Sequence, residues 1–133
     1  MLPNEIVLPV DLLNTGSTTD QTYTRADYSS GKSQYEGSNH ALNARDLVIF
    51  NRTYPKENGN FLGVKRSTTK VIQDVTVLGK DGISSITQPM SIETRYVIPV
   101  GTPEATVLEL RQRNIALQDD DATMDPLNNK LHV

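Results

Sequence analysis

Cysteine and tryptophan are absent from this 133-residue sequence, and aromatic residues make up only 5% of it. Without cysteine the protein has no disulfides, no thiolate nucleophile and no cysteine-ligated metal. No apolar run approaches the length that spans a membrane. The N-terminal stretch MLPNEIVLPVDLL also lacks the basic start and small-residue cleavage site of a signal peptide. We therefore expect a soluble protein that stays in the compartment where it is made.

The composition fits one domain with a small core. Apolar residues account for 36% of the chain, so a single chain of this length buries little, and association would help it. The net charge of −3 is unevenly spread, because residues 101–133 hold six acids and three bases whereas residues 45–70 are basic. The basic segment either binds a polyanion or forms a solvated face of a sheet, which is the commoner explanation on charge alone. Its bases are Arg45, Arg52, Lys56, Lys65, Arg66 and Lys70, against the acids Asp46 and Glu57.

The clearest local signal is a strand that leads into a helix within residues 86–117. Apolar and polar residues alternate through residues 91–100, which is typical of a strand with one buried face. Gly101 ends the strand. Thr102 can then accept a hydrogen bond from a free backbone N–H, and Pro103 suits the first helical position because it has no N–H to leave unpaired. The sequence therefore predicts a helix that begins at about Pro103.

The predicted helix carries apolar side chains over about half of its circumference. Two apolar edges flank a polar pair, which indicates a helix that touches two bodies, namely a partner's sheet and a neighbouring helix. An ordinary amphipathic helix with a snorkelling arginine explains the pattern equally well. The apolar residues are Val107, Leu108, Leu110, Ile115 and Leu117, and the polar pair is Arg111 and Asn114.

Strands and turns alternate before this helix. Turn sequences such as PKENGN at residues 55–60 and GKDG at residues 79–82 separate the strands, and Gly63 marks a bulge. A second short helix is predicted near residues 126–130, with Asp125 as its cap. The predicted strands cover residues 5–13, 21–28, 33–36, 46–54, 61–78 and the segment that ends at Val100.

Strands first and helices last define the α+β class. We expect one domain with an N-terminal hairpin (1–28), an antiparallel meander sheet of about five strands (33–100) and two C-terminal helices (103–131). Two helices cover only one face of such a sheet. If each chain's helices cross to the partner's sheet, a two-fold dimer buries one face of both sheets and leaves the other face open. The predicted dimer interface consists of Tyr96, Ile98, Val107, Leu108, Leu110, Arg111 and Ile115.

The open face is expected to be polar. Arginine and lysine suit phosphates, and asparagine, serine and threonine suit bases and sugars, so this face has the chemistry to bind nucleic acid. Alternation alone does not decide whether Arg52, Arg66 and Lys70 replace some of the residues on this face, because a bulge at Gly63 would exchange the faces. Without that exchange the face carries some of Asn51, Thr53, Lys65, Ser67, Thr69, Ser91, Glu93 and Arg95.

This arrangement resembles the coat proteins of single-stranded RNA bacteriophages, the levivirus group. The resemblance rests on the length, the lack of a helix before about residue 100, the N-terminal hairpin, the strand–turn–strand around PKENGN and above all the run RYVIPVGTPEATVLELRQRNIAL. In that family a last long strand ends in a similar apolar–Pro–apolar step and passes through a Thr/Asn-rich turn into the first of two helices. The resemblance covers residues 46–131, and the N-terminal third in outline.

The resemblance implies a structural protein without enzymatic activity or cofactor. Interlocked homodimers would assemble in the bacterial cytoplasm into an icosahedral shell, the capsid of a virion, around single-stranded genomic RNA. In relatives one dimer also binds an RNA hairpin and represses translation. The loop within Gly79–Gln88 would make contacts around the shell's symmetry axes. The RNA-binding residues would be Asn51, Thr53, Lys65, Arg66, Ser67, Thr69, Ser91, Glu93 and Arg95.

Other constellations in the sequence are weaker. Asp119–Asp121 and Asp125 have the oxygen ligands that Ca²⁺ prefers, but their spacing matches no calcium loop, and a solvated linker is the favoured interpretation. His40 and His132 are isolated and no nucleophile-elbow sequence is present, so we predict neither an enzyme nor a metal site. The alternative to a shell-forming protein is a small, non-assembling β-rich binding module whose ligand the sequence does not reveal.

Overall fold

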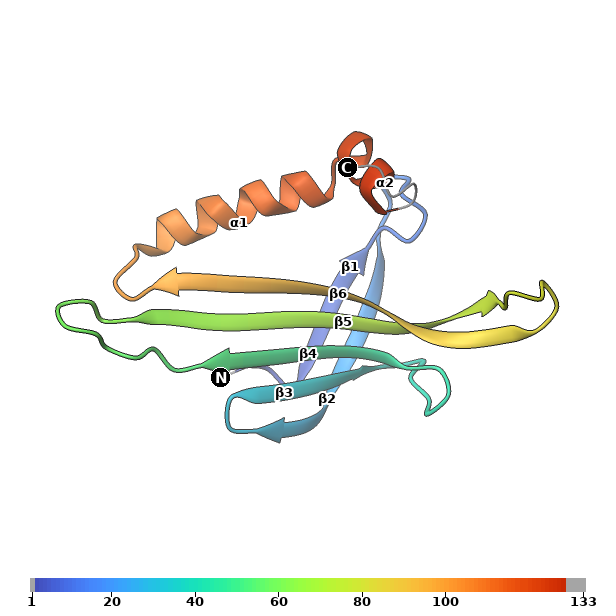
Figure 1. Cartoon of the computed structure of the whole chain (residues 1–133), viewed down its shortest axis with the longest axis horizontal. Coiled ribbons are helices and arrows are strands. Elements are labelled where there is room, and N and C mark those ends of the chain that lie inside the picture. Colours follow the sequence, from blue (N-terminus) through green and yellow to red (C-terminus); the bar gives the residue numbers. More distant parts are fainter. Residues whose placement is uncertain (1, 129–133) are drawn as a thin grey trace. The chain divides into compact units, whose positions relative to one another are not determined.

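The computed structural model describes residues 2–128, which form six strands and two helices (Figure 1). The strands lie in one antiparallel sheet in sequence order, β1-β2-β3-β4-β5-β6, so each strand pairs with the next one along the chain. The α+β prediction is confirmed. The elements are β1 (Glu5–Val10), β2 (Thr19–Ser29), β3 (Lys32–Gly37), β4 (Asp46–Thr53), β5 (Val64–Leu78), β6 (Ser85–Pro99), α1 (Glu104–Gln118) and α2 (Asp121–Asn128).

The chain divides into two compact units. The first unit comprises the residues up to Pro55 together with Lys65–Val97, and therefore holds almost all of the sheet. The second unit comprises Lys56–Val64 and the chain from Ile98 onward, and holds both helices.

The core of the first unit is small. Tyr23, Tyr35 and Val48 are buried, and Ile6 and Phe50 pack against them. The rings of Tyr35 and Phe50 meet edge to face with their centres 5.5 Å apart, a favourable geometry for aromatic pairs. These five residues come from β1 to β4, so the buried apolar cluster lies in the N-terminal half of the sheet.

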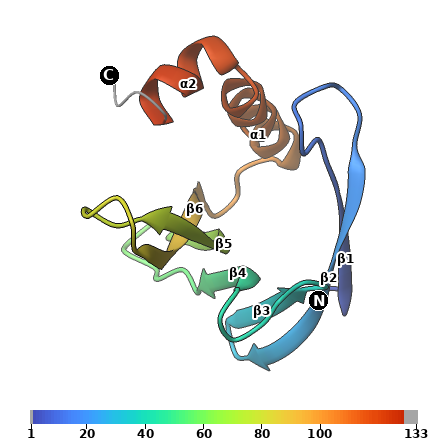
Figure 2. The ribbon, with the colours of Figure 1, turned by 90° about the vertical axis from the view of Figure 1, so that its right-hand side faces the viewer.

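The N-terminal segment is held against this core by polar contacts. The Tyr35 hydroxyl donates to the Pro3 carbonyl (2.5 Å), and the Arg25 guanidinium donates to the carbonyls of Leu2 and Pro3. A bulge in β2 after Arg25 brings Tyr28 onto the same side as Arg25, whose guanidinium lies 5.4 Å from the Tyr28 ring centre. Figure 2 shows β1 and the adjoining part of β2 turned away from β3 and β4.

The β5–β6 turn is organised by one carboxylate. Asp81 accepts hydrogen bonds from the backbone N–H groups of Ile83 (3.0 Å) and Ser84 (2.9 Å) and from the Ser84 hydroxyl (2.6 Å). These bonds, the hydroxyl first, lower the pKa of Asp81 to about 2. Gly82 has a φ of +69°, which glycine adopts without a steric penalty. The predicted GKDG turn therefore exists, and its aspartate closes it.

In the second unit, Gly63 precedes β5 instead of forming a bulge inside a longer strand. Gly63 has a φ of +95°. Gly101, which follows the end of β6 as predicted, has a similar φ of +93°. The Val100 N–H donates to the Gly63 carbonyl (3.0 Å) and joins the two glycine segments. The predicted strand 61–78 is thus shorter than expected, because the left-handed backbone at Gly63 is incompatible with an extended strand.

The first helix begins where it was predicted, but its cap differs from the prediction. The α1 helix begins at Glu104 with Pro103 as the flanking residue and no side-chain cap, because the Thr102 hydroxyl donates back to the Pro99 carbonyl (2.8 Å) instead of accepting a helix N–H. The prediction of a Thr102 cap is therefore wrong.

The α2 helix begins at Asp121, five residues before the predicted start, and Pro126 lies inside it. The Asp120 carbonyl accepts the N–H groups of Thr123 (3.2 Å) and Met124 (2.9 Å), and its carboxylate accepts the Thr123 hydroxyl (2.7 Å). Asp120, not Asp125, thus sets the start. The last residues of the predicted second helix, 129 and 130, lie outside the described residues, as does residue 131 of the predicted helical region. Neither helix within residues 2–128 is long and apolar enough to cross a membrane.

Candidate functional site

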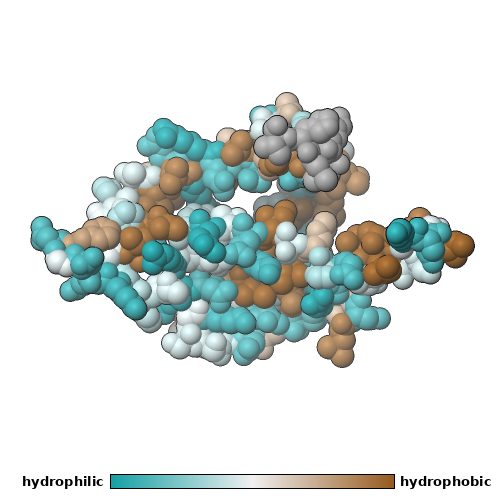
Figure 3. All heavy atoms as spheres, viewed as in Figure 1, coloured by the Kyte–Doolittle hydropathy of each residue, from teal (hydrophilic) through white to brown (hydrophobic). Residues whose placement is uncertain are grey.

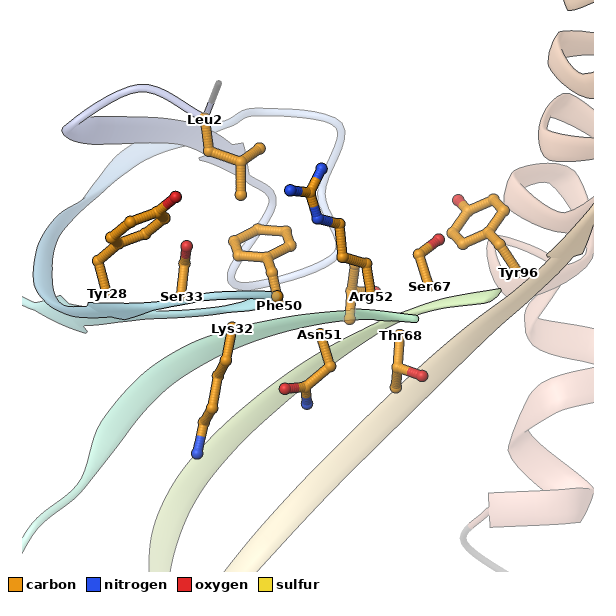
Figure 4. Close-up of a pocket in the computed structure, with 12 residues that line it drawn as sticks. Leu2, Tyr28, Lys32, Ser33, Phe50, Asn51, Arg52, Ser67, Thr68 and Tyr96 are labelled. Carbon is orange, nitrogen blue, oxygen red and sulfur yellow. The ribbon is translucent and has the colours of Figure 1, made fainter. Parts of the chain in front are cut away.

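The sheet of the first unit has two chemically different faces, which the strand register defines. Lys32 of β3 pairs with Asn51 of β4, and Asn51 pairs with Thr68 of β5. Because directly paired residues point to the same side of a sheet, these three side chains share one face, here called the polar face. Figure 4 shows them pointing one way, whereas Phe50 and Tyr96 point the other way. The side that carries Tyr35, Phe50 and Tyr96 is called the aromatic face.

Alternation along the strands extends the polar face. Thr53 pairs with Arg66 and Ile49 pairs with Lys70, so the basic side chains of β5 at these positions lie beside Asn51 and Thr68. On the neighbouring strand, the hydroxyl oxygens of Thr76 and Thr87 lie 3.2 Å apart, which places the odd-numbered residues of β6 on the polar face. The position of Tyr96 on the aromatic face agrees with this assignment (Figure 4).

Six of the nine predicted RNA-binding residues therefore share the polar face. The other three, Lys65, Ser67 and Thr69, lie on the aromatic face, since β5 alternates about the Thr53–Arg66 pair. The expectation that they share a face with Asn51 is wrong. The six residues on the polar face are Asn51, Thr53, Arg66, Ser91, Glu93 and Arg95.

The three basic residues that a bulge at Gly63 would have placed on the open face do not all lie on the same face. Arg66 and Lys70 lie on the polar face, whereas Arg52 pairs with Ser67 and lies on the aromatic face. The Arg52 guanidinium stacks against Tyr54, with 5.4 Å between its central carbon and the ring centre. Arg52 therefore lies on the opposite side of the sheet from the basic side chains of Lys32, Arg66 and Lys70.

Two members of the polar face were missed in the sequence. Lys32 lies one residue before the predicted third strand, and Thr68 was passed over in favour of Ser67 and Thr69. The signal for Lys32 is the Gly31 turn, because Gly31 has a φ of +80° and its carbonyl accepts the N–H of Arg52, which fixes the first pair of the β3–β4 ladder.

Three acids of the polar face, Glu36, Asp74 and Glu93, each lie beside a basic neighbour. Glu93 lies 3.7 Å from the Arg95 guanidinium, and Glu36 lies 3.7 Å from the imidazole of His40. Asp74 accepts hydrogen bonds from the Arg45 side chain and its backbone N–H, which lower the pKa of the Asp74 carboxyl.

Three cations of this face have no ion pair within residues 2–128. These are Lys32, Arg66 and Lys70. Over β4 to β6 the bases Arg66, Lys70 and Arg95 outnumber the acids Asp74 and Glu93, so this part of the polar face is positively charged although the chain as a whole is acidic.

The aromatic face exposes a large apolar surface over β5 and β6. Ile92 is 68% exposed and Met90 is 54% exposed, although both belong to a residue class that is normally buried. A concave site of about 650 Å³ opens on this side, with Leu2, Tyr28, Phe50 and Tyr96 among its walls (Figure 4). The further exposed apolar residues at aromatic-face positions of these strands are Val71, Val75, Val77 and Ile86.

The predicted interface residues of the helix are also largely uncovered. Leu108, Leu110 and Ile115 are exposed, Val107 is half-buried, and no described residue of α1 is buried. Arg111 is exposed, and on β6 both Tyr96 and Ile98 are half-buried. The predicted set thus consists of apolar and basic side chains that are available for contact. Among residues 2–128, no group of three or more histidine, aspartate or glutamate side chains is arranged to hold a metal ion.

Solved structures share this architecture. A chain of the virus-like particle of bacteriophage AVE019 matches with a TM-score of 0.78 and 16% identity, over 100% of this chain and 99% of that chain. The virus-like particle of Beihai levi-like virus 32 matches with a TM-score of 0.67 and 15% identity, over 83% and 86% of the two chains. The coat protein of bacteriophage EMS014 matches with a TM-score of 0.59 and 15% identity, over 88% and 74%.

These likenesses define the fold. No protein-family model matches the sequence, and no curated protein sequence matches it either. The chain has the fold of the coat proteins of levi-like phages, along nearly its whole length and that of the AVE019 subunit. The resemblance read from the sequence is therefore confirmed for the fold.

Proposed function

We propose that this protein is the coat protein of a single-stranded RNA phage, a structural protein that assembles into a capsid. The observation that carries the proposal is the two-sided sheet, in which one face is apolar and uncovered and the other is polar and, over β4 to β6, positively charged. The shared fold with subunits of virus-like particles supports the same role. This role requires neither a catalytic centre nor a cofactor.

The first step of assembly is a homodimer that covers the aromatic face. A soluble monomer rarely exposes a contiguous apolar surface as extensive as the one over β5 and β6. The occupant that fits is the C-terminal region of a second copy, because α1 carries Leu108, Leu110 and Ile115 uncovered. We include Tyr96, Ile98, Val107 and Arg111 in this interface, since they lie on the same two elements.

RNA is the proposed partner of the polar face. The face offers guanidinium and ammonium groups for phosphates, and amide and hydroxyl groups for sugars and bases. We assign RNA contacts to Asn51, Thr53, Arg66, Ser91 and Arg95, with Glu93 orienting Arg95 through their ion pair. Lys32, Thr68 and Lys70 join this set because the register places them on the same face.

The tip of the β5–β6 hairpin is the proposed contact between dimers. Ile83 is 85% exposed there, next to the turn that Asp81 closes. Figure 3 shows apolar surface gathered at this end of the hairpin. An apolar tip on a rigid turn suits repeated contacts between neighbouring dimers in a shell, which would form in the bacterial cytoplasm and become the capsid of the virion.

Size and nucleic acid content of the purified protein test this proposal. Expressed in bacteria, the protein is expected to elute from a sizing column as particles in the megadalton range, with the ultraviolet absorbance of nucleic acid, and to appear as shells by electron microscopy. A stable monomer at micromolar concentration would refute the proposal. It would favour a non-assembling binding module, for which the concave site on the aromatic face would then be the ligand site.

A further inference from the structure

We infer that the polar face binds RNA through its phosphates and without regard to base sequence, so that this chain packages RNA but does not select an RNA hairpin. The inference rests on the proposed function and specifies the chemistry of its RNA site. It follows from three properties of the polar face, namely its lack of aromatic rings, the positions of its two arginines and the spacing of its free cations.

No aromatic ring of the described strands lies on the polar face. Tyr23, Tyr35 and Phe50 form the core on the aromatic side, and Tyr28 and Tyr96 line the concave site on that side. Tyr54 follows β4 and is held against Arg52, which belongs to the aromatic face. Sequence-specific recognition of RNA loops depends on bases that stack on aromatic rings or on flat guanidinium groups, each stacked base contributing about 1–3 kcal/mol. The polar face therefore lacks the aromatic platforms on which bases would stack.

The guanidinium groups do not replace these rings. Arg95 lies 3.7 Å from the Glu93 carboxylate, which competes with a base for its flat group. Arg66 pairs with Thr53, the last residue of β4, and so lies at the border of the paired region, away from the central row of Lys32, Asn51 and Thr68. The remaining cations are lysines, whose ammonium groups act as point charges on phosphates and do not stack.

The free cations are spaced for a phosphate backbone and not for a single base. Arg66 and Lys70 are four residues apart on β5, which corresponds to about 13 Å at the usual rise of a strand. Lys32 lies two strands away from Thr68, at about 10 Å. Only small side chains, Asn51 and Thr68, lie between them. Three charges at such distances contact successive or alternate phosphates of one strand and do not converge on one nucleotide.

Salt dependence of binding measures this mechanism. Three free cations in each chain give six in a dimer, which predicts that log K falls with log salt with a slope of about −4 for single-stranded RNA. Between 50 mM and 200 mM salt, the affinity is then expected to fall by about 250-fold. The experiment uses dimers of the full chain released from shells and fluorescent single-stranded RNAs of equal length, namely oligo(U), oligo(A), a mixed sequence and a stem-loop.

The four RNAs are expected to bind with affinities within about threefold of one another, with the same slope. The Lys70→Gln variant removes two of six charges from the dimer and is expected to reduce the slope by about 1.4 for every RNA. The Lys65→Gln variant is the matched control, because Lys65 lies on the same strand but on the aromatic face. It is expected to leave the slope unchanged.

Two results would overturn the inference. One is a stem-loop or a mixed sequence that binds more than about 30-fold tighter than oligo(U) at the same salt concentration. The other is a salt-dependence slope that changes in Lys65→Gln but not in Lys70→Gln. Should either variant fail to fold, the slope is measured instead in Lys32→Gln, which also removes a cation from the polar face. Failure of the proposed function is recognised separately, because a protein that forms no shells fails the sizing experiment whatever its RNA preference.

Discussion

The side of the sheet that a partner covers is tested most directly by two substitutions on β6. Ile92 and Val97 lie on the same strand and are both more than half exposed, but Ile92 belongs to the aromatic face and Val97 to the polar face. Truncating each to alanine removes apolar surface without adding a polar group. We expect Ile92→Ala to weaken the dimer and Val97→Ala to leave it unchanged.

The magnitude follows from the exposure of Ile92 in the single chain. Complete burial of an isoleucine contributes about 1.5–3 kcal/mol. Because 68% of Ile92 remains for a partner to cover, the partner's share is roughly 1–2 kcal/mol for each chain. A two-fold dimer contains the substitution twice, so Ile92→Ala is expected to cost about 2–4 kcal/mol, which raises the dissociation constant by roughly 30- to 1,000-fold.

Sedimentation equilibrium of disassembled protein over a range of concentrations measures this constant, and circular dichroism confirms that each variant keeps its sheet. If Val97→Ala weakens the dimer and Ile92→Ala does not, the partner covers the polar face, and the assignment of RNA to that face fails with it. If neither substitution changes the constant, the apolar surface over β5 and β6 is not the dimer interface.

Three further predictions concern stability. Burial and the hydrogen bond to Asp46 raise the pKa of Tyr23 to about 12, so the protonated hydroxyl stabilises the fold fully below pH 10, and this contribution is lost as the pH rises toward 12. In thermal melts, Tyr23→Phe should lower the stability at neutral pH by about 1 kcal/mol and remove this part of the loss of stability at alkaline pH. The pKa of Asp81 is lowered to about 2, so its carboxylate supports the β5–β6 turn at any pH above the ordinary value of 3.8 and loses this role only as the pH falls toward 2. An NMR titration should find a pKa of about 2 for Asp81, and Asp81→Ala should speed the exchange of the Ser84 amide hydrogen. In Gly63→Ala the new methyl group would lie 2.3 Å from the Lys56 carbonyl oxygen, so we expect a loss of more than ~1 kcal/mol in chemical denaturation, whereas Gly59→Ala, with a similar backbone and no atom within 4 Å, should cost less.

The existence and order of the strands could be predicted from the sequence because one side of each strand differs from the other. The predicted strand 46–54 and the observed β4, Asp46–Thr53, differ by a single residue. Alternation of apolar and polar side chains has a period of two residues, and this pattern can be recognised in a single strand without knowing which strand pairs with it. The turn residues of PKENGN and GKDG supplied the remaining boundaries.

The membership of each face could not be predicted in the same way. Whether Lys65 or Arg66 reaches the polar face depends on which residue of β5 pairs with Thr53, and a shift of one residue would exchange them. That register is set by the conformation of the loop before β5, where Gly63 adopts a positive φ. A glycine in the sequence signals an unusual backbone but not whether it interrupts a strand or precedes it.

The start of the second helix was missed for a related reason. Proline is frequent at first helical positions, so Pro126 suggested a start that the structure places at Asp121. The bonds that start α2 come from Asp120, and three successive aspartates offer no pattern that distinguishes the one that caps.

The sequence-ordered sheet also bears on how the protein comes off the ribosome. Every strand pairs with the strand synthesised just before it, so each hairpin can close while the next segment is still being translated. Proteins whose pairings are this local fold quickly for their size. The helices emerge last, after all six strands. In the proposed dimer, each chain would therefore have its sheet formed before its helices pack on the sheet of a second copy.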